Sequence, residues 1–186
     1  MDGWWAASYI ALWLLVIVLA VVVAALARQI GTLHLRLGPR GALELDDEGP
    51  ALEEILPVTT ATSVEGTAVS LGGPGEAQLL LFVSPGCGVC EQVLPSIPVI
   101  AQAGRIAPYV LTDVDAEETE LAYKNKRLGV PLVPASEAVL RYGIPGTPYV
   151  VVTDATGTVR AKGTVNNLEQ MEGLVDSADK RSRTGA

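Results

Sequence analysis

The feature that most constrains how this chain can fold is a long uncharged stretch close to its N-terminus. From Trp4 to Ala27 the sequence carries no Asp, Glu, Lys or Arg, and these 24 residues exceed the roughly 20 that a helix needs to cross the hydrocarbon core of a bilayer. Trp4 and Trp5 stand where an aromatic belt would lie, and Arg28 ends the stretch abruptly. We therefore predict a transmembrane anchor at residues 4–27.

Two further features concern how this anchor is processed and oriented. The tripeptide Ala25-Leu26-Ala27 matches the small-x-small pattern of a signal-peptide cleavage site, but the N-terminal end carries Asp2 and no basic side chain, which favours an uncleaved anchor. Arg28, Arg36 and Arg40 follow the stretch, whereas no basic residue precedes it. The positive-inside rule, taken alone, would therefore leave the C-terminal domain in the cytoplasm.

The remaining chain divides by composition into a linker, one domain and a short tail. Residues 28–57 contain Gly38-Pro39 and an acidic, proline-bearing stretch, and we interpret them as a juxtamembrane linker. Residues 58–178 suffice for one domain of roughly 120 residues, and residues 179–186 are typical of a disordered basic tail. The formal net charge of -8 argues against a nucleic-acid partner, since such proteins carry a basic face.

Strand-like and helix-like segments alternate within the domain. Two β-prone runs flank Glu65-Gly66, and the continuous apolar run at 77–84 is typical of a buried central strand. The other expected elements are a helix at 87–104 kinked by its prolines, a strand at 106–114, a helix at 115–130 whose solvated side holds Lys124, Lys126 and Arg127, a short helix at 134–144, a hairpin turning at 154–157 and a final helix at 166–180. This order predicts an α/β fold with a central mixed sheet flanked by helices.

The only two cysteines, Cys87 and Cys90, lie in the stretch "LLLFVSPGCGVC". Cys87 follows the buried strand and opens a helix, where free backbone N–H groups and the helix dipole stabilise a thiolate. Cys90 lies one helical turn further on, close enough to form a disulfide with Cys87. The spacing predicts a redox pair in which Cys87 is the nucleophile and Cys90, less exposed, resolves the mixed disulfide.

Other uses of the two thiols remain open from the residues alone. Structural zinc takes four ligands, and this chain offers two thiols and the distant His34, so we predict no metal site and no cofactor. Two thiolates can hold Cu(I), which keeps a copper carrier as an alternative. Peroxidase chemistry that uses the Ser84 hydroxyl, and a merely structural pair, are weaker alternatives.

A second candidate feature is Thr147-Pro148 at the entrance of a strand. Proline removes a hydrogen-bond donor from a sheet, which is unusual inside one. A cis Thr147-Pro148 bond would explain this placement, and it would turn the backbone toward an incoming peptide thiol. The alternative is an ordinary trans turn before the strand. We therefore assign Thr147 and Pro148 as candidate substrate-binding residues.

Taken together, these residues resemble the thioredoxin superfamily, and the membrane anchor and leading hairpin resemble its TlpA-like and redoxin branch. The segment 25–43 after the membrane helix, with "LLFVSPGCGVC" further on, most resembles the methylamine-utilisation accessory proteins of the MauD family. The resemblance implies a thioredoxin-like fold, redox roles for Cys87 and Cys90, and a cis-proline at Pro148. It also implies a client, the small (beta) subunit of methylamine dehydrogenase, and a thiol electron partner in the membrane or periplasm.

The chain departs from the superfamily pattern at two places. Thioredoxins carry a buried acid six residues before the first cysteine, where this chain has Leu81, and Gly88-Val89 lacks both the proline of reducing thioredoxins and the histidine of strong oxidases. The direction of exchange therefore stays open.

We expect a single-pass protein of the bacterial inner membrane with a periplasmic domain, although the arginines favour the other side. The alternatives are a TlpA-like reductase for cytochrome c or other metalloproteins, and a tethered copper-binding or chaperone module.

Overall fold

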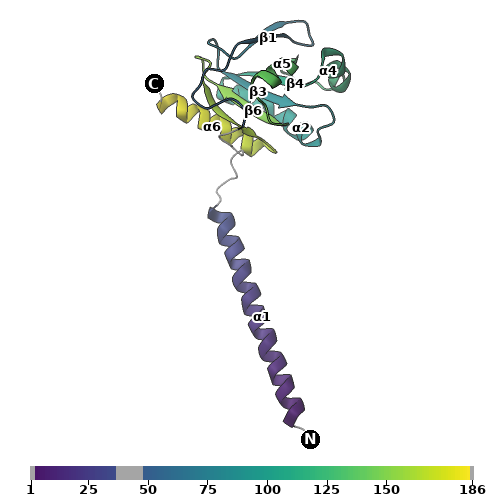
Figure 1. Ribbon diagram of the computed structural model, residues 1–186, viewed down its shortest axis with the longest axis vertical. Coiled ribbons are helices and arrows are strands. Elements are labelled where there is room, and N and C mark those ends of the chain that lie inside the picture. The colour runs from purple at the N-terminus through teal and green to yellow at the C-terminus, as the bar shows by residue number, and fades with distance from the viewer. Residues whose placement is uncertain (1–2, 37–47, 185–186) are drawn as a thin grey trace. The chain divides into compact units, whose positions relative to one another are not determined.

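The computed structural model describes residues 3–36 and 48–184, which form two compact units. The first is helix α1, Gly3–Arg36 (Figure 1). Among the described helices it is the one long and apolar enough to cross a membrane, over Gly3–Val23. The large apolar side chains between Trp4 and Val23, such as Leu15, are exposed rather than packed in a core. The helix continues nine residues beyond the predicted anchor, into the predicted linker, and Gly38-Pro39 of that linker lies outside the described residues.

The second unit contains a five-stranded sheet, a separate two-stranded hairpin and the remaining helices. Its elements are β1 Thr59–Thr62, β2 Ala68–Leu71, β3 Gln78–Val83, α2 Gly88–Val93, the 3-10 turn η1 Leu94–Ser96, α3 Ile97–Gly104, β4 Ala107–Thr112, α4 Ala116–Tyr123, β5 Leu132–Pro134, α5 Ser136–Arg141, β6 Tyr149–Thr153, β7 Val159–Thr164 and α6 Leu168–Thr184. The predicted break in the helix after the cysteines is confirmed, because η1 separates α2 from α3 where Pro95 and Pro98 remove backbone donors.

The sheet has the strand order β5-β4-β3-β6-β7, with β3 at its centre. Strand β3 pairs in parallel with β4 and antiparallel with β6, so the sheet is mixed as predicted. Hairpin β1-β2 forms its own small sheet. The carboxyl ends of β3 and β4 and the amino end of β6 therefore meet at one edge of the central sheet.

Both faces of the central sheet are covered, which explains why β3 is apolar from Leu79 to Val83. Leu79, Leu81 and Val83 pack in one cluster with α2, α3 and α6, whereas Leu80 and Phe82 pack in the other with α5 and the end of β2. Figure 1 shows α6 on one side of the sheet and α5 with the β1 hairpin on the other. All six side chains of β3 are buried, as expected of a central strand with helices on both sides.

The last third of the predicted linker, residues 48–57, packs against the domain as a strap. Leu56 is buried in the cluster that contains α5. The strap also pairs with β7: the Glu53 N–H donates to the Val159 carbonyl (2.9 Å), and the Val159 N–H donates to the Glu54 carbonyl (2.8 Å). The linker prediction is wrong for these residues. Their acidic composition suggested a loop, but Leu52 and Leu56, the pairing with β7 and hydrogen bonds to the Glu48 carbonyl hold them in place.

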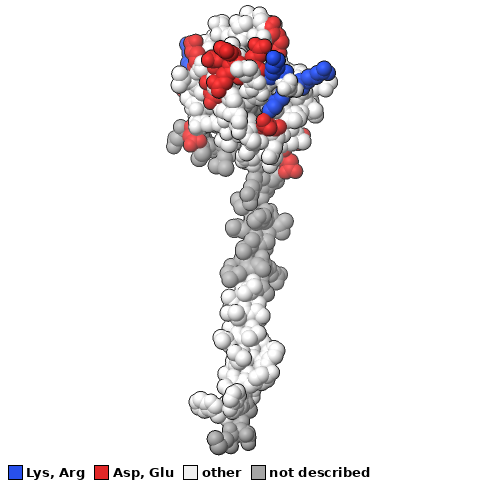
Figure 2. All heavy atoms as spheres, turned by 90° about the vertical axis from the view of Figure 1, so that its right-hand side faces the viewer, with Lys and Arg blue, Asp and Glu red and all other residues white. Residues whose placement is uncertain are grey.

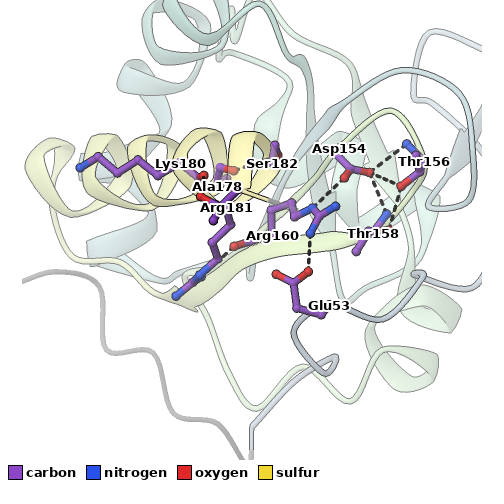
Figure 3. Close-up of polar contacts among 10 residues, drawn as sticks. Glu53, Asp154, Thr156, Thr158, Arg160, Ala178, Lys180, Arg181 and Ser182 are labelled. Atoms are coloured by element: carbon purple, nitrogen blue, oxygen red, sulfur yellow. Dashed lines mark hydrogen bonds and ion pairs between the residues drawn. The ribbon is translucent and has the colours of Figure 1, made fainter. Parts of the chain in front are cut away.

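A polar cluster joins the strap, the β6–β7 hairpin and α6 (Figure 3). Arg160 Nε donates to Asp154 Oδ2 at 2.7 Å, another nitrogen of Arg160 pairs with Glu53 of the strap, and Arg181 Nη1 donates to the Arg160 carbonyl at 2.7 Å. Burial acts to raise the pKa of Asp154, but hydrogen bonds from Thr156 and Arg160 outweigh it and hold the pKa below its ordinary value. The cluster fastens three segments that lie far apart in the sequence.

The C-terminal tail is helical rather than disordered as far as Thr184. Helix α6 continues through the segment that we predicted to be unstructured, and residues 185–186 lie outside the described part of the chain. Ala178 is buried, Arg181 bonds to β7, and Arg183 pairs with Asp179 one turn earlier at 2.6 Å. Basic side chains in the last turn also suit the negative end of the helix dipole.

The predicted helix at 115–130 is shorter than expected. Helix α4 ends at Tyr123, so the cations of its expected solvated side follow the helix instead of lying on it. The Lys126 amide donates to the Tyr123 carbonyl (2.8 Å), and Lys126 Nζ reaches Glu91 of α2 at 2.6 Å. Lys124 and Arg127 are exposed, as expected for solvated cations.

Candidate active site

The two cysteines lie at the sheet edge where β3, β4 and β6 meet. Cys87 follows β3 after a short turn, and α2 begins at the next residue. Because β6 runs antiparallel to β3, the residues that precede β6 return to the same edge. The topology thus brings Thr147-Pro148 next to Cys87, although 60 positions separate Thr147 from Cys87.

Cys87 and Cys90 form a disulfide, with an S–S distance of 2.17 Å and a Cα–Cα distance of 5.2 Å. Cys87 is the N-cap of α2, and its sulfur accepts a hydrogen bond from the Cys90 N–H at 3.2 Å. Cys90 is fully buried in the cluster under α2, whereas Cys87 is half-buried. One sulfur of the pair is therefore accessible and the other is enclosed, as the sequence predicted.

Thr147-Pro148 is a cis peptide bond, so this prediction is confirmed. The Thr147 carbonyl oxygen lies 3.9 Å from Cys87 Sγ. Pro148 is buried, and its own carbonyl accepts a hydrogen bond from the Val165 N–H at 3.2 Å, which fixes the start of β6 against the chain after β7. The half-buried Thr147 backbone is thereby held beside the accessible sulfur.

Two further residues of the site were not singled out for this role from the sequence, namely Ser84 and Asp113. Thr147 Oγ1 donates to Ser84 Oγ at 3.0 Å, and Ser84 Oγ donates to Asp113 Oδ2 at 2.6 Å. Ser84 had entered only as a hydroxyl for peroxidase chemistry, and Asp113 as the end of a strand. Strand register is the signal that could have found them. Ser84 directly follows β3 and Asp113 directly follows β4, and these two strands are parallel neighbours.

The environment of Cys90 is apolar. Leu81, which occupies the position of the buried thioredoxin acid, is fully buried in the same cluster as Cys90. Tyr123 belongs to this cluster as well. Burial, reinforced by the negative charges of Asp113 and Glu91, raises the pKa of Tyr123 to about 12. Its phenol therefore stays neutral near pH 7.

The surface beside the site is acidic. The stretch from the end of β4 through α4 carries five exposed carboxylates, Asp113, Asp115, Glu117, Glu118 and Glu120. Figure 2 shows acidic side chains gathered on the side of the domain that α4 occupies, with a few basic side chains next to them. Asp115 caps α4 by accepting the Glu118 N–H at 2.9 Å. Helix capping therefore accounts for the presence of Asp115 among these five carboxylates.

Comparison with known proteins places this geometry in a class. A family model described as "Thioredoxin-like domain" matches residues 65–179. The thioredoxin domain of a thiol-disulfide oxidoreductase from Bacteroides vulgatus has a similar fold, with a TM-score of 0.56 at 21% identity over 70% of this chain and 96% of that one. The fold is therefore thioredoxin-like, in agreement with the resemblance seen in the sequence.

Relatives that match nearly the whole chain narrow the class. The methylamine utilization protein MauD of Paracoccus versutus is 36% identical, over 94% of this chain and 88% of that protein. The MauD protein of Methylorubrum extorquens is 34% identical, over 94% of this chain and 86% of that protein. The chain belongs to the MauD family of thioredoxin-like proteins. Its Cys-X-X-Cys disulfide accordingly has a thioredoxin-like redox role.

Proposed function

We propose that this protein is a membrane-anchored thiol–disulfide oxidoreductase in which Cys87 attacks and Cys90 resolves. One observation carries the proposal: the two sulfurs form a disulfide at the start of α2, with Cys87 accessible and Cys90 fully buried. A purely structural disulfide does not require one exposed and one buried sulfur. In a redox pair the accessible sulfur meets the partner, and the enclosed sulfur reacts only within the protein.

The exchange follows from this arrangement. In the reduced protein, the Cys87 thiolate attacks one sulfur of a client disulfide, the client S–S bond breaks, and the second client sulfur leaves and takes a proton. The Cys90 thiolate then attacks the Cys87 sulfur and releases the first client sulfur as a thiol. The protein ends as the Cys87–Cys90 disulfide, two electrons have passed to the client, and the reverse sequence oxidises a client dithiol. The Cys90 N–H, which donates to the Cys87 sulfur, stabilises negative charge on it in either direction.

Thr147 and Pro148 serve as the docking surface for the client backbone. The Thr147 carbonyl lies beside Cys87 Sγ, so an extended client segment that reaches the sulfur also reaches this stretch of backbone. Pro148 has no N–H to offer to the sheet, and it leaves the approach to Cys87 free of a competing backbone donor. The two residues thus hold a client cysteine at attacking distance.

The proposed client is the small (beta) subunit of methylamine dehydrogenase. Relatives that cover most of this chain carry the name methylamine utilization protein. Resemblance to that family also implies a client that is rich in disulfides, and Cys87 and Cys90 are the groups that can make or rearrange them. A thiol protein of the membrane or periplasm would return the pair to its working redox state. We propose disulfide formation as the working direction.

The proposed location is the inner membrane, with α1 as a single uncleaved span and the domain in the periplasm. Helix α1 is apolar and long enough for this role. A periplasmic domain accords with disulfide chemistry, which is suppressed in the reducing cytoplasm. The arginines that follow the apolar stretch count for the opposite orientation. Labelling of intact cells with a membrane-impermeant thiol reagent, after chemical reduction, separates the two: Cys87 reacts from outside in one case and only after lysis in the other.

The decisive experiment is trapping through Cys90→Ser. This variant keeps the attacking sulfur but lacks the resolving one, so we expect a stable mixed disulfide between Cys87 and the methylamine dehydrogenase small subunit in cells that produce both. Cys87→Ser is the matched control, because it removes the accessible sulfur and leaves the enclosed one, and it should trap nothing. Equal trapping by both variants, or full function of Cys87→Ser, would overturn the assignment. A trapped cytochrome-maturation protein would point to the TlpA-like alternative, and retention of Cu(I) by the reduced pair without any trapping would point to the copper carrier.

A further inference from the structure

We propose that Ser84 and Asp113 are positioning residues that hold Thr147 in place beside Cys87 and so determine how tightly the site binds the backbone of a disulfide client. The inference rests on the proposed function of Cys87. It adds that the affinity for the client depends on two hydrogen bonds in series, from Thr147 through Ser84 to Asp113. Neither Ser84 nor Asp113 need touch the client for this effect.

Strand register places these residues together. In the parallel pair β3–β4, Val83 lies opposite Thr112, and in the antiparallel pair β3–β6, Phe82 lies opposite Tyr149. Continuing both registers beyond the strand ends sets Ser84 between the residue after β4 and the Thr147-Pro148 bond before β6. The backbone hydrogen bonds between β3 and its neighbours β4 and β6 end here. Beyond this point side-chain hydrogen bonds connect the three strands.

The connection has a fixed direction. The Thr147 hydroxyl donates to Ser84 Oγ at 3.0 Å, and the Ser84 hydroxyl donates to Asp113 Oδ2 at 2.6 Å. An ionised carboxylate only accepts, so it orients the Ser84 hydroxyl toward itself and leaves the serine oxygen free to accept from Thr147. The bond to a carboxylate is the stronger kind, and hydrogen bonds in series polarise one another. The charge on Asp113 therefore acts on Thr147 through Ser84.

Ser84 also holds the other half of the site. Its carbonyl accepts the Cys87 N–H at 3.3 Å, while its hydroxyl accepts from Thr147. The same residue thus sets the position of the nucleophile's backbone and of the loop whose carbonyl lies 3.9 Å from the Cys87 sulfur. A small shift of that loop would misplace the client relative to the sulfur, and catalysis is sensitive to such shifts.

The neighbouring carboxylate provides a contrast. Asp115 lies two residues from Asp113 and is also exposed, but its Oδ1 accepts the Glu118 N–H at the start of α4. Asp113 instead lies at the strand end and points its carboxylate at Ser84. Asp113→Asn and Asp115→Asn each remove one negative charge from the same stretch of chain, whereas only Asp113 is joined to the site. Asn retains helix-capping ability, so Asp115→Asn should not disturb α4.

The test uses the full-length reduced protein in detergent micelles. Its substrate, in excess, is an extended peptide whose single cysteine forms a mixed disulfide with a coloured thiol, so that release of colour follows a single turnover. Here KM is the peptide concentration that half-saturates the rate of this turnover, and kcat is its limiting rate constant. We expect Ser84→Ala and Asp113→Asn each to raise KM about fivefold, the effect of one lost hydrogen bond, with kcat changed less than about twofold. The double variant should have the same KM as Ser84→Ala alone, because both changes break the same series of hydrogen bonds. Asp115→Asn should behave as the wild type.

Two variants of Thr147 give a second readout that general destabilisation would not reproduce. Thr147→Ser keeps the hydroxyl and should have a lower KM than Thr147→Val, which keeps the shape, loses the hydroxyl and should match Ser84→Ala. Unchanged KM in Ser84→Ala and Asp113→Asn would overturn the inference, as would an equal rise in Asp115→Asn or additive effects in the double variant. A folded wild-type protein that does not react with the peptide would overturn the proposed function itself, and this inference with it.

Discussion

The two ends of strand β6 carry opposite kinds of polar structure. At its start, Thr147 lies beside the half-buried Cys87, and the side-chain contacts are the two hydrogen bonds that run from Thr147 through Ser84 to Asp113. At its end, Asp154 binds Arg160, whose side chain is only 12% exposed and also pairs with the strap. Polar groups are left accessible at the first end and are enclosed at the second.

This difference shows how the fold separates reaction from stability. A disulfide that must meet a partner cannot be covered by a tightly packed polar cluster, and reacting regions are generally drawn from the less stable parts of a structure. The far end of β6 meets no such requirement, and there Arg160 joins the strap, the hairpin and, through its carbonyl, α6. We expect changes at one end to affect mainly stability and changes at the other mainly the exchange reaction.

The largest effect on stability is expected from Arg160→Ala. The change leaves Asp154 without its charged partner in a partly buried place. Breaking a fully buried pair costs about 3–5 kcal/mol, and the partial exposure of this one lowers the expected loss to about 2–3 kcal/mol of unfolding free energy. The rate of peptide-disulfide exchange per folded molecule should stay within about twofold of the wild type, since the cluster lies at the other end of β6. Urea unfolding of the oxidised full-length protein in micelles measures the first quantity, and the coloured peptide assay measures the second.

Arg183→Ala is the matched control. Arg183 pairs with Asp179 on α6, but its side chain is 77% exposed, so its loss should cost less than about 0.5 kcal/mol. If Arg160→Ala slowed the exchange as strongly as it lowered stability, the two ends of β6 would be coupled and the proposed separation would be wrong.

The sequence predicted the parts of this architecture that depend on local pattern. The uncharged N-terminal stretch marked α1, the apolar run at 77–84 marked the central strand, and the prolines after Cys90 marked the break between α2 and α3. Spacing alone placed Cys87 and Cys90 within disulfide distance. The place of Pro148 left a cis and a trans bond open, and the family resemblance favoured the cis bond. Each of these signals lies within a few residues of the feature that it predicts.

Apart from the early end of α4, the missed features depend on contacts between distant segments. The strap is held by Leu56, by its pairing with β7 and by the contact between Glu53 and Arg160, and its own acidic composition reveals none of these. The last turns of α6 are held partly by the bond from Arg181 to β7, which a basic tail does not reveal. Ser84 and Asp113 come together only through the registers of β3 with its two neighbours. The secondary-structure propensities of neighbouring residues do not indicate which distant segments pair with one another.

The Asp154 carboxylate should make the far end of β6 sensitive to acid. Its pKa in the folded protein lies below the ordinary value of 3.8, so its stabilising effect is complete above that value and is lost as the pH falls through the folded pKa. The stability advantage of the wild type over Asp154→Asn should therefore be constant near neutral pH and shrink below about pH 4. Thermal unfolding midpoints of both proteins at pH 7 and pH 3 measure this. Asp176→Asn, which removes an exposed charge on α6, controls for net charge, and an advantage that grew at pH 3 would contradict the prediction.

The smallest effect is expected at the reacting end, from Lys126→Met. Lys126 pairs with Glu91 next to Cys90 at 2.6 Å and lies 5.2 Å from the centre of the Tyr123 ring, but the two charged side chains are 35% and 57% exposed. Exposed pairs contribute about 0–1 kcal/mol and less in high salt, and methionine retains the apolar stem over the ring. We expect a loss below about 0.5 kcal/mol that vanishes in 0.5 M salt, with Lys124→Met as the exposed control. A salt-independent loss as large as that of Arg160→Ala would mean that the reacting end is held as firmly as the far end, and the difference between the two ends of β6 would then lie in accessibility alone.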